Sequence, residues 1–106
     1  MDHRPDLYID FDDTIHDTKN VSEGHKMGQP TAGAVNAVRY LSRSYRIIVF
    51  TVRGDQPYIK DWLRHFNIPF DAVTNVKGPA VAYVDDKAVH FDGNWNRVIQ
   101  EVQSGR

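Results

Sequence analysis

Apolar residues group into short runs along this chain, and polar, turn-forming residues separate the runs. Four runs predict strands, because they have strand length and are bounded by turn signals. These runs are Leu7–Ile9, Arg46–Thr51, Phe70–Thr74 and Val81–Val84, and Ala88–Phe91 predicts a small further strand. Three other segments carry apolar residues at helical spacing, namely Ala34–Leu41, Tyr58–Phe66 and Trp95–Val102.

Strands that alternate with helices predict an α/β fold built from parallel βαβ units. We therefore expect an open, mainly parallel, Rossmann-like sheet with helices on both faces. A length of 106 residues suits one domain over residues 1–106. Ligands of such sheets bind beyond the carboxyl ends of the strands, so the residues that follow each strand are the first candidates for a site.

The segments between these elements add local expectations. His16–Pro30 is polar and has too few apolar residues to pack as a helix, which predicts a loop or a small flap over the strand end. Thr31 is the predicted N-cap of the first helix, and Pro57 suits the first turn of the second. Trp62 and Trp95 fall on the apolar stripes of their helices and are predicted to lie in the core.

Composition excludes several classes of function. The net charge is −1 and there is no cysteine, so disulfides, thiolate catalysis and cysteine-bound zinc are excluded, and no overall charge points to nucleic acid or an anionic membrane. No apolar run approaches the roughly 18 residues that a membrane span needs. The N-terminal residues are polar and lack the apolar core of a secretory signal. We expect no membrane partner and a cytoplasmic location.

Reactive side chains follow three of the predicted strands and precede one. They are Asp10 and Asp12 after the first strand, Thr51 at the end of the second, Lys77 before the fourth, and Asp85 and Asp86 after it. Extended residues two apart point the same way, so Asp10 and Asp12 should face one site while Phe11 turns into the core. Adjacent carboxylates repel unless a cation or a shared proton offsets the repulsion.

Two interpretations of the acidic stretch are open. A solvated acidic turn after an edge strand explains Asp10 and Asp12 taken alone. Reactive groups at three separate strand ends favour a metal-assisted phosphoryl-transfer site instead. Phosphoryl transfer needs a nucleophile in line with the leaving oxygen and positive charge around the equatorial oxygens.

Four groups of these residues, in chain order, resemble the four motifs of the haloacid dehalogenase superfamily, specifically its phosphatases. The groups are Asp10-Phe11-Asp12-Asp13-Thr14-Ile15, Phe50-Thr51, Lys77 and Tyr83-Val84-Asp85-Asp86. The resemblance spans essentially the whole chain and implies a phosphoric monoester hydrolase. Asp13 departs from it, because many members carry glycine there. The intervals between the motifs leave no residues for the cap domain of many members, so we expect a capless form.

Each catalytic residue then has an expected role. Asp10 is the predicted nucleophile, which forms an aspartyl phosphate. Asp12 is the predicted general acid and base, and a neighbouring carboxylate should raise its pKa. Lys77 would hold Asp10 and the phosphate as a point charge, and Thr51 would donate a hydrogen bond to a phosphate oxygen.

The expected cofactor is Mg²⁺, which suits a site of oxygen ligands completed by the substrate phosphate. The predicted ligands are Asp10, Asp85 and the backbone carbonyl of Asp12, the last as the resemblance implies. Asp86 would touch the metal directly or through water. Its alternative role is to cap local backbone amides.

Arg53 and Asp13 are the predicted substrate-binding residues. Arg53 has the reach to bind a phosphate with two hydrogen bonds, and a surface salt bridge is the alternative. Without a cap, a bulky substrate such as a polynucleotide end or a phosphoprotein would cover the site; a second subunit or a small phosphate ester held under the flap is the alternative. We expect a monomer or a small homo-oligomer. His16 and His90 are interpreted as bystanders, because no pair of histidines shows zinc spacing.

Two other functions compete with the phosphatase. A phospho-accepting receiver domain also uses aspartates, a threonine and a lysine, but here an acidic pair follows Lys77, and no aspartate ends the second or third strand. A catalytically silent binding module of the same fold is the second competitor. Intact Asp10 and Asp12 disfavour it, because losing either would be the simplest route to silence.

Overall fold

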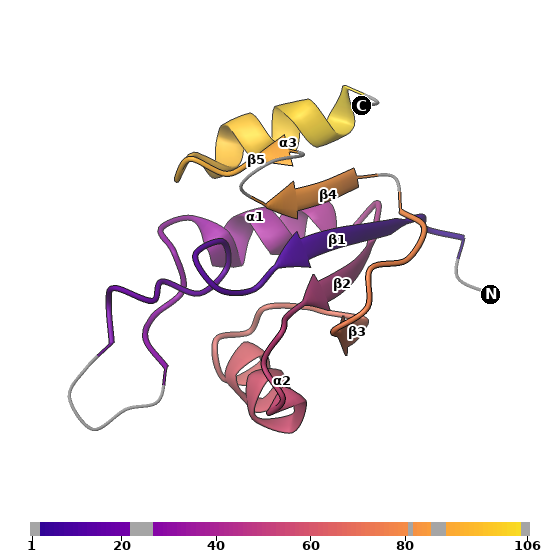
Figure 1. Cartoon of the computed structure of the whole chain (residues 1–106). Coiled ribbons are helices and arrows are strands. Elements are labelled where there is room, and N and C mark those ends of the chain that lie inside the picture. Colours follow the sequence, from indigo (N-terminus) through magenta and orange to yellow (C-terminus); the bar gives the residue numbers. More distant parts are fainter. Residues whose placement is uncertain (1–2, 22–26, 81, 86–88, 105–106) are drawn as a thin grey trace.

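The computed structural model describes residues 3–21, 27–80, 82–85 and 89–104, in which strands and helices alternate along most of the chain (Figure 1). In order the elements are β1 (Asp6–Asp10), α1 (Ala34–Leu41), β2 (Arg46–Phe50), α2 (Gln56–His65), β3 (Ala72–Thr74), β4 (Ala82–Asp85), β5 (Val89–His90) and α3 (Trp95–Gln103). None of these helices has the length and apolar character needed to cross a membrane.

The strands form one five-stranded sheet in the order β3-β2-β1-β4-β5, and every neighbouring pair is parallel. The prediction of an α/β fold with an open, parallel sheet is therefore confirmed. β1 lies in the centre, between β2 and β4, because its residues Leu7 to Ile9 are apolar and buried on both faces.

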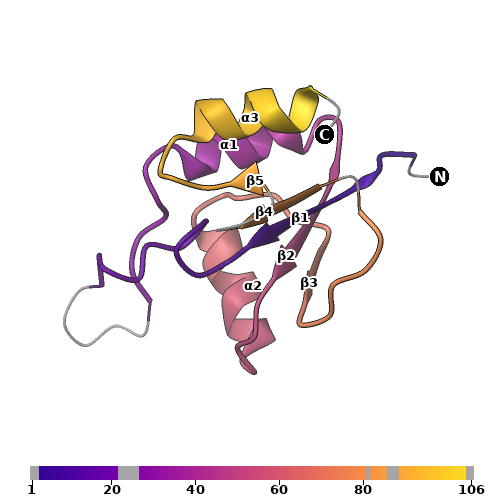
Figure 2. The same ribbon diagram turned by 45° about the horizontal axis from the view of Figure 1, so that its top comes forward.

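All three helices cover the same face of the sheet. Their buried side chains form one core with alternate sheet residues such as Leu7, Ile9 and Val49. β1, β2 and β3 follow one another across the sheet in one direction, and right-handed crossovers then put α1 and α2 on one side. α3 packs against α1, and the two helices lie side by side in both ribbon views (Figures 1 and 2).

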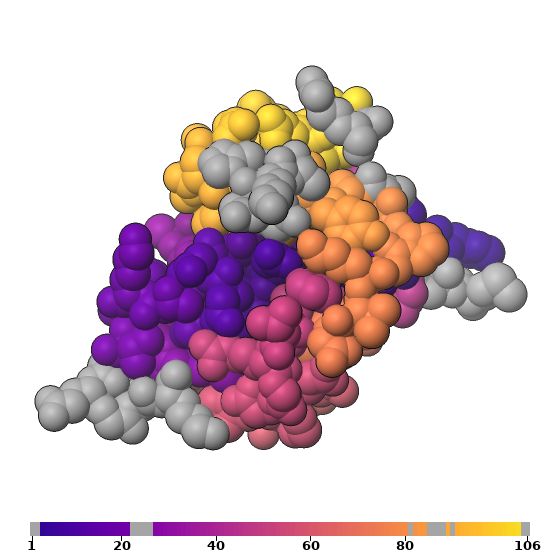
Figure 3. All heavy atoms as spheres, viewed as in Figure 1, coloured from indigo at the N-terminus to yellow at the C-terminus, as the bar shows by residue number. Residues whose placement is uncertain are grey.

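The opposite face of the sheet carries Tyr8, Ile48, Phe50 and Tyr83 and is crossed by the β3–β4 connection. The Tyr83 hydroxyl donates to the carbonyl of Gly78 in that connection. The orange atoms of this connection and of β4 spread over the face in the space-filling view (Figure 3).

Among the described residues no helix lies on this second face, so the expectation of helices on both faces is wrong. A helix on the second face would come from the β3–β4 connection, and the stretch 75–81 is too short for a helix with its turns.

The predicted start is wrong for α1 and confirmed for α2. Thr31 was the predicted N-cap of α1, but Gly33 occupies that position. The Thr31 hydroxyl instead donates a hydrogen bond to the Thr14 carbonyl at 2.6 Å. The hydroxyl oxygen of Thr31 also accepts a hydrogen bond from the indole N–H of Trp95 at 3.0 Å, so Thr31 links the β1–α1 loop to α3. Asp55 precedes α2, and Pro57 lies in its first turn, as predicted.

The β1–α1 connection is a folded loop rather than a helix, which confirms the prediction for the described part of His16–Pro30. It turns sharply after β1, because the Phe11 carbonyl accepts from the amides of Ile15 and His16 at 3.0 and 2.8 Å. Phe11 and Ile15 enter the core, as do Trp62 and Trp95, which confirms the core predictions for Phe11 and both tryptophans.

Candidate active site

The order of the strands places the candidate site at the carboxyl ends of β1 and β4. The chain runs outward from β1 on one side through β2 and β3 and continues on the other side through β4, so the gap between β1 and β4 is the switch point of the sheet. Ile9 pairs with Val84, which makes Asp10 and Asp85, one residue later on each strand, backbone neighbours. The side chain of Asp85 and all of Asp86 lie outside the described residues.

Asp10 belongs to a row of residues that crosses this edge of the sheet. It pairs with Phe50 of β2, which in turn pairs with Thr74 of β3. Paired residues of a parallel sheet point to the same face, so these side chains share the face that the helices leave uncovered. Asp10 is half-buried.

Lys77 reaches the same edge from the β3–β4 connection. Its ammonium lies 4.9 Å from the centre of the Phe50 ring and 5.6 Å from that of Tyr83. Contact between a cation and aromatic faces is favourable by about 0.5–2 kcal/mol. The ammonium is thus held above the residue that pairs with Asp10, which brings these two predicted catalytic residues to one end of the sheet.

Thr51 follows β2 directly and is 4% exposed. Its amide donates to the Thr74 carbonyl at 2.9 Å, which extends the β2–β3 pairing by one bond. Its hydroxyl oxygen accepts from the Arg53 amide at 3.0 Å. That bond uses a lone pair and leaves the hydroxyl proton for another acceptor, as a phosphate-binding role requires.

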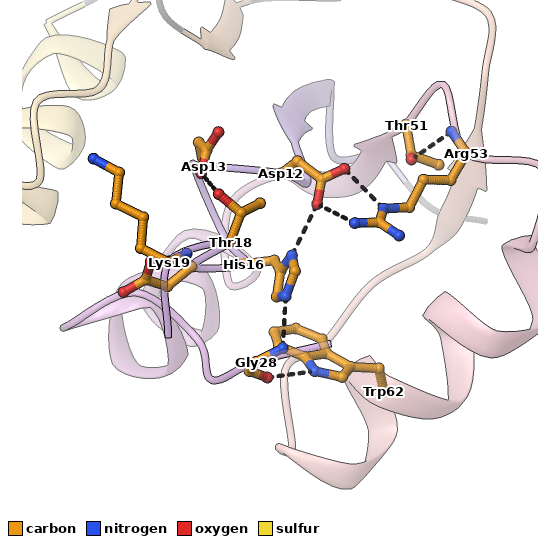
Figure 4. A network of polar contacts seen from close by, with 10 residues as sticks. Asp12, Asp13, His16, Thr18, Lys19, Gly28, Thr51, Arg53 and Trp62 are labelled. Carbon is orange, nitrogen blue, oxygen red and sulfur yellow. Dashed lines mark hydrogen bonds and ion pairs between the residues drawn. The ribbon is translucent and has the colours of Figure 1, made fainter. Parts of the chain in front are cut away.

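Arg53 and Asp12 form a two-pronged ion pair (Figure 4). The Arg53 Nε–H donates to Asp12 Oδ2 at 2.8 Å, and Nη2–H donates to Oδ1 at 3.1 Å. His16 Nδ1 lies 2.8 Å from the same Oδ1. Of the two interpretations of Arg53, the salt bridge is therefore the one present, and its partner is a predicted catalytic residue.

The pKa of Asp12 is lowered, whereas the sequence argument expected it to be raised. Burial disfavours the charged form, but the hydrogen bonds from Arg53 and His16, together with the positive charge of Arg53, outweigh that effect. The pKa of Arg53 rises in turn, chiefly through its hydrogen bond to Asp12. The expected repulsion by a neighbouring carboxylate is thus overridden by a cation that the sequence argument had assigned to the substrate.

The side chain of Asp13 points away from that of Asp12 (Figure 4). Its φ of 61° is left-handed, a conformation that glycine adopts freely and aspartate tolerates better than most residues. A glycine would adopt the same backbone conformation at this position. The Thr18 hydroxyl donates to the Asp13 carboxylate. Asp13 lines a separate hollow of about 480 Å³ with Asp17, Lys19, Thr31, Ala32, Phe91 and Gly93.

His16 is the site residue that sequence reasoning missed. It is 1% exposed and contacts Asp12, although it was interpreted as a bystander. The signal that could have found it is its position four residues after Asp12, in a polar loop that had to fold back on the strand end. Zinc spacing, the criterion applied, does not detect a histidine whose partner is a carboxylate.

The oxygen atoms of the described residues fit part of a Mg²⁺ site. Asp10 supplies a carboxylate at the sheet edge, and within the described ranges no hydrogen bond is donated to the Asp12 carbonyl. No cluster of three or more acidic or histidine side chains is found among the described residues, but the predicted ligand Asp86 and the side chain of Asp85 are not among them. The donor chemistry, all oxygen, is the kind that Mg²⁺ prefers.

Comparisons with protein-family models, with curated proteins and with solved structures found no match to this chain. The resemblance to haloacid dehalogenase phosphatases therefore rests on the four sequence motifs alone.

Proposed function

We propose that this protein is a phosphoric monoester hydrolase of the haloacid dehalogenase type that works through an aspartyl phosphate on Asp10. The observation that carries the proposal is that Asp10, the backbone of Asp85 and the Lys77 ammonium all lie at the carboxyl end of the sheet. Open α/β sheets bind their ligands at the carboxyl ends of their strands. The motif order along the chain supports the same conclusion.

The reaction would take place in two displacements. A carboxylate oxygen of Asp10 attacks phosphorus, and the bond from phosphorus to the leaving oxygen breaks as Asp12 gives that oxygen a proton. Water then attacks the phosphorus of the aspartyl phosphate. Asp12 takes the proton of the water, the bond to Asp10 breaks, and inorganic phosphate leaves.

Positive charge would come from residues that already lie at the strand ends. Lys77 would offset the charge of Asp10 and the phosphate, and the Thr51 hydroxyl would donate to a phosphate oxygen. Bound Mg²⁺, held by Asp10, the Asp12 carbonyl and Asp85 with help from Asp86, would draw electron density from the phosphate oxygens. A carboxylate attacking a phosphate dianion needs such cations nearby.

Arg53 gives Asp12 a way to change its protonation state. A substrate phosphate offers Arg53 a second two-pronged acceptor of higher charge than a carboxylate. When Arg53 turns to the phosphate, Asp12 loses the largest influence that lowers its pKa and can hold the proton that the first displacement requires. Arg53 would thus bind substrate, as the sequence predicts, and prepare the acid at the same time.

The test is a phosphatase assay on an aryl phosphate with EDTA-treated protein, with and without added Mg²⁺. We expect turnover only with the metal, and we expect Asp10→Asn to abolish it while the circular dichroism and unfolding curve stay unchanged. Loss of the nucleophile should cost several orders of magnitude, because the attack on phosphorus depends on the carboxylate oxygen of Asp10. Phosphate binding without turnover in the wild-type protein would favour the silent binding module instead.

A further inference from the structure

The ring of His16 is hydrogen-bonded through both nitrogens. Nδ1 lies 2.8 Å from Asp12 Oδ1, and Nε2 accepts from the amide of Gly28 at 2.8 Å. A backbone N–H can only donate, so Nε2 must carry a lone pair and no proton. The proton of the neutral ring is then on Nδ1, where it is donated to Asp12. The Gly28 amide thereby selects the tautomer that faces the carboxylate.

Two aromatic side chains, together with the Gly28 amide, fix the plane of this ring. Phe11 stacks on it with a centroid distance of 5.0 Å and an angle of 12°, and Trp62 of α2 meets it edge-on at 5.5 Å. The indole of Trp62 also donates to the Gly28 carbonyl at 3.0 Å. Gly28 is therefore bound on both sides of its backbone, by His16 and by Trp62 (Figure 4).

Gly28 can occupy this place because it has no side chain. A Cβ there would lie 2.0 Å from the carbonyl oxygen of Asn20. The loop thus brings a bare backbone amide to the ring in a space that no other residue fits, and the His16 geometry follows from that packing.

We propose that His16 is a positioning residue for Asp12. Arg53 and His16 bind the carboxylate together, and if Arg53 leaves for a phosphate, the Nδ1–H donor of His16 still holds Oδ1 and keeps the carboxyl group aimed at the reacting oxygen. This inference rests on the proposed function, because it assigns His16 to the acid–base step of that reaction.

Two substitutions separate the two bonds of the ring. His16→Asn places an amide N–H near the Nδ1 position and keeps a donor to Asp12, but it loses the Gly28 bond. His16→Gln places a carbonyl oxygen near the Nε2 position and keeps the Gly28 bond, but it loses the donor to Asp12. Both remove the aromatic stacking, so each is the matched control of the other.

We expect His16→Gln to lower kcat on an alkyl phosphate by about 10²-fold, the scale of a misplaced catalytic group, with KM unchanged. The loss on an aryl phosphate should be smaller, because a good leaving group needs less protonation. His16→Asn should keep kcat on both substrates within a few-fold of wild type. Equal losses in the two variants, or equal losses on the two substrates, would overturn the positioning role.

Nuclear magnetic resonance tests the inference without activity. In protein labelled with ¹⁵N-histidine, the His16 signals should show a protonated Nδ1 and an unprotonated Nε2, and the ¹³Cγ signal of Asp12 should move in His16→Gln more than in His16→Asn. An Nε2–H tautomer would overturn the inference whatever the activity. A protein with the expected signals but no turnover on any phosphate ester would remove the proposed function and leave the contact between His16 and Asp12 as the property established.

Discussion

Three hydrogen bonds converge on the carboxylate of Asp12, two from Arg53 and one from His16. Such an arrangement stabilises the charged form, which is the state that a general base requires. The acid form requires that Arg53 find another acceptor. At the residue scale, the proposed reaction therefore depends on how readily one guanidinium exchanges a carboxylate for a phosphate.

Arg53→Gln tests that ion pair through its dependence on pH. Because the pKa of Asp12 is lowered in the folded state, the pair stabilises the fold above the pKa of an unfolded aspartate, about 3.9, and loses this contribution as the pH falls through the folded pKa. About a third of each side chain is exposed, so solvent screening limits the effect to about 1 kcal/mol at pH 7.

Urea unfolding of wild type and Arg53→Gln, followed by tryptophan fluorescence, measures the difference. We expect the wild type to be more stable at pH 7 and the gap to narrow below about pH 4. A gap of the same size at pH 7 and pH 3 would mean that Arg53 stabilises the fold through packing rather than through charge.

Some of the site could be predicted from the sequence and some could not. The positions of Asp10 and Thr51 could be predicted because each stands at the carboxyl end of a strand, and Lys77 lies in the connection that follows β3. The partner of Arg53 and the role of His16 were missed. Both depend on the path of the β1–α1 loop, which is set by contacts such as the one from Gly28, 12 residues after His16.

At the scale of elements, the strands and helices followed their periodicity, but the side of the sheet that the helices cover did not follow the general rule. The rule of two covered faces assumes a helix in every crossover. The connection between β3 and β4 is the short stretch 75–81, so among the described elements no helix covers the second face of the sheet. The length of the connection between two strands therefore predicts better than the general rule whether a helix covers that face of the sheet.

Gly28→Ala should destabilise the β1–α1 loop. The added methyl group would meet backbone atoms of Asn20 and Asp17 well inside contact distance, so the loop must shift and weaken the bonds to His16 and Trp62. Overpacking of this kind typically costs about 1–3 kcal/mol. Urea unfolding measures the loss.

Gly54→Ala is the matched control, because a methyl group there would have nothing within 4 Å. We expect its unfolding free energy to equal that of wild type within about 0.5 kcal/mol. If the two alanine variants were equally stable, the loop would be able to move away from Asn20 without cost, and Gly28 would not fix the position of His16.

At the scale of the whole molecule, the helices and strands that the structure describes all belong to the sheet and its single helical layer, and none of them covers the carboxyl edge. Two valines flank the candidate site there: Val52, 84% exposed, lies between Thr51 and Arg53, and Val76, 65% exposed, precedes Lys77. Exclusion of water strengthens electrostatic catalysis, so a cover is expected from outside this layer.

We expect a bulky phosphorylated substrate to supply that cover. The value of kcat/KM should be higher for 3′- or 5′-phosphorylated oligonucleotides or for phosphopeptides than for mononucleotides and sugar phosphates. Sedimentation run alongside determines whether a second copy covers the site instead. A monomer that clearly prefers a small sugar phosphate would contradict this prediction. A dimer with the same preference would mean that the second copy covers the site.

The central place of β1 has a consequence for how the molecule opens. β1 has hydrogen-bonded neighbours on both sides, whereas β3 has one, so amide hydrogen exchange should be slowest at Leu7 and Ile9 and faster in β3. Exchange measured residue by residue would test this order. A transient fraying of the β3 edge would carry the connection with Lys77 away and leave Asp10 seated on β1. Local opening of β3 would then convert the site from a form that holds both the nucleophile Asp10 and the Lys77 ammonium into a form that holds Asp10 alone.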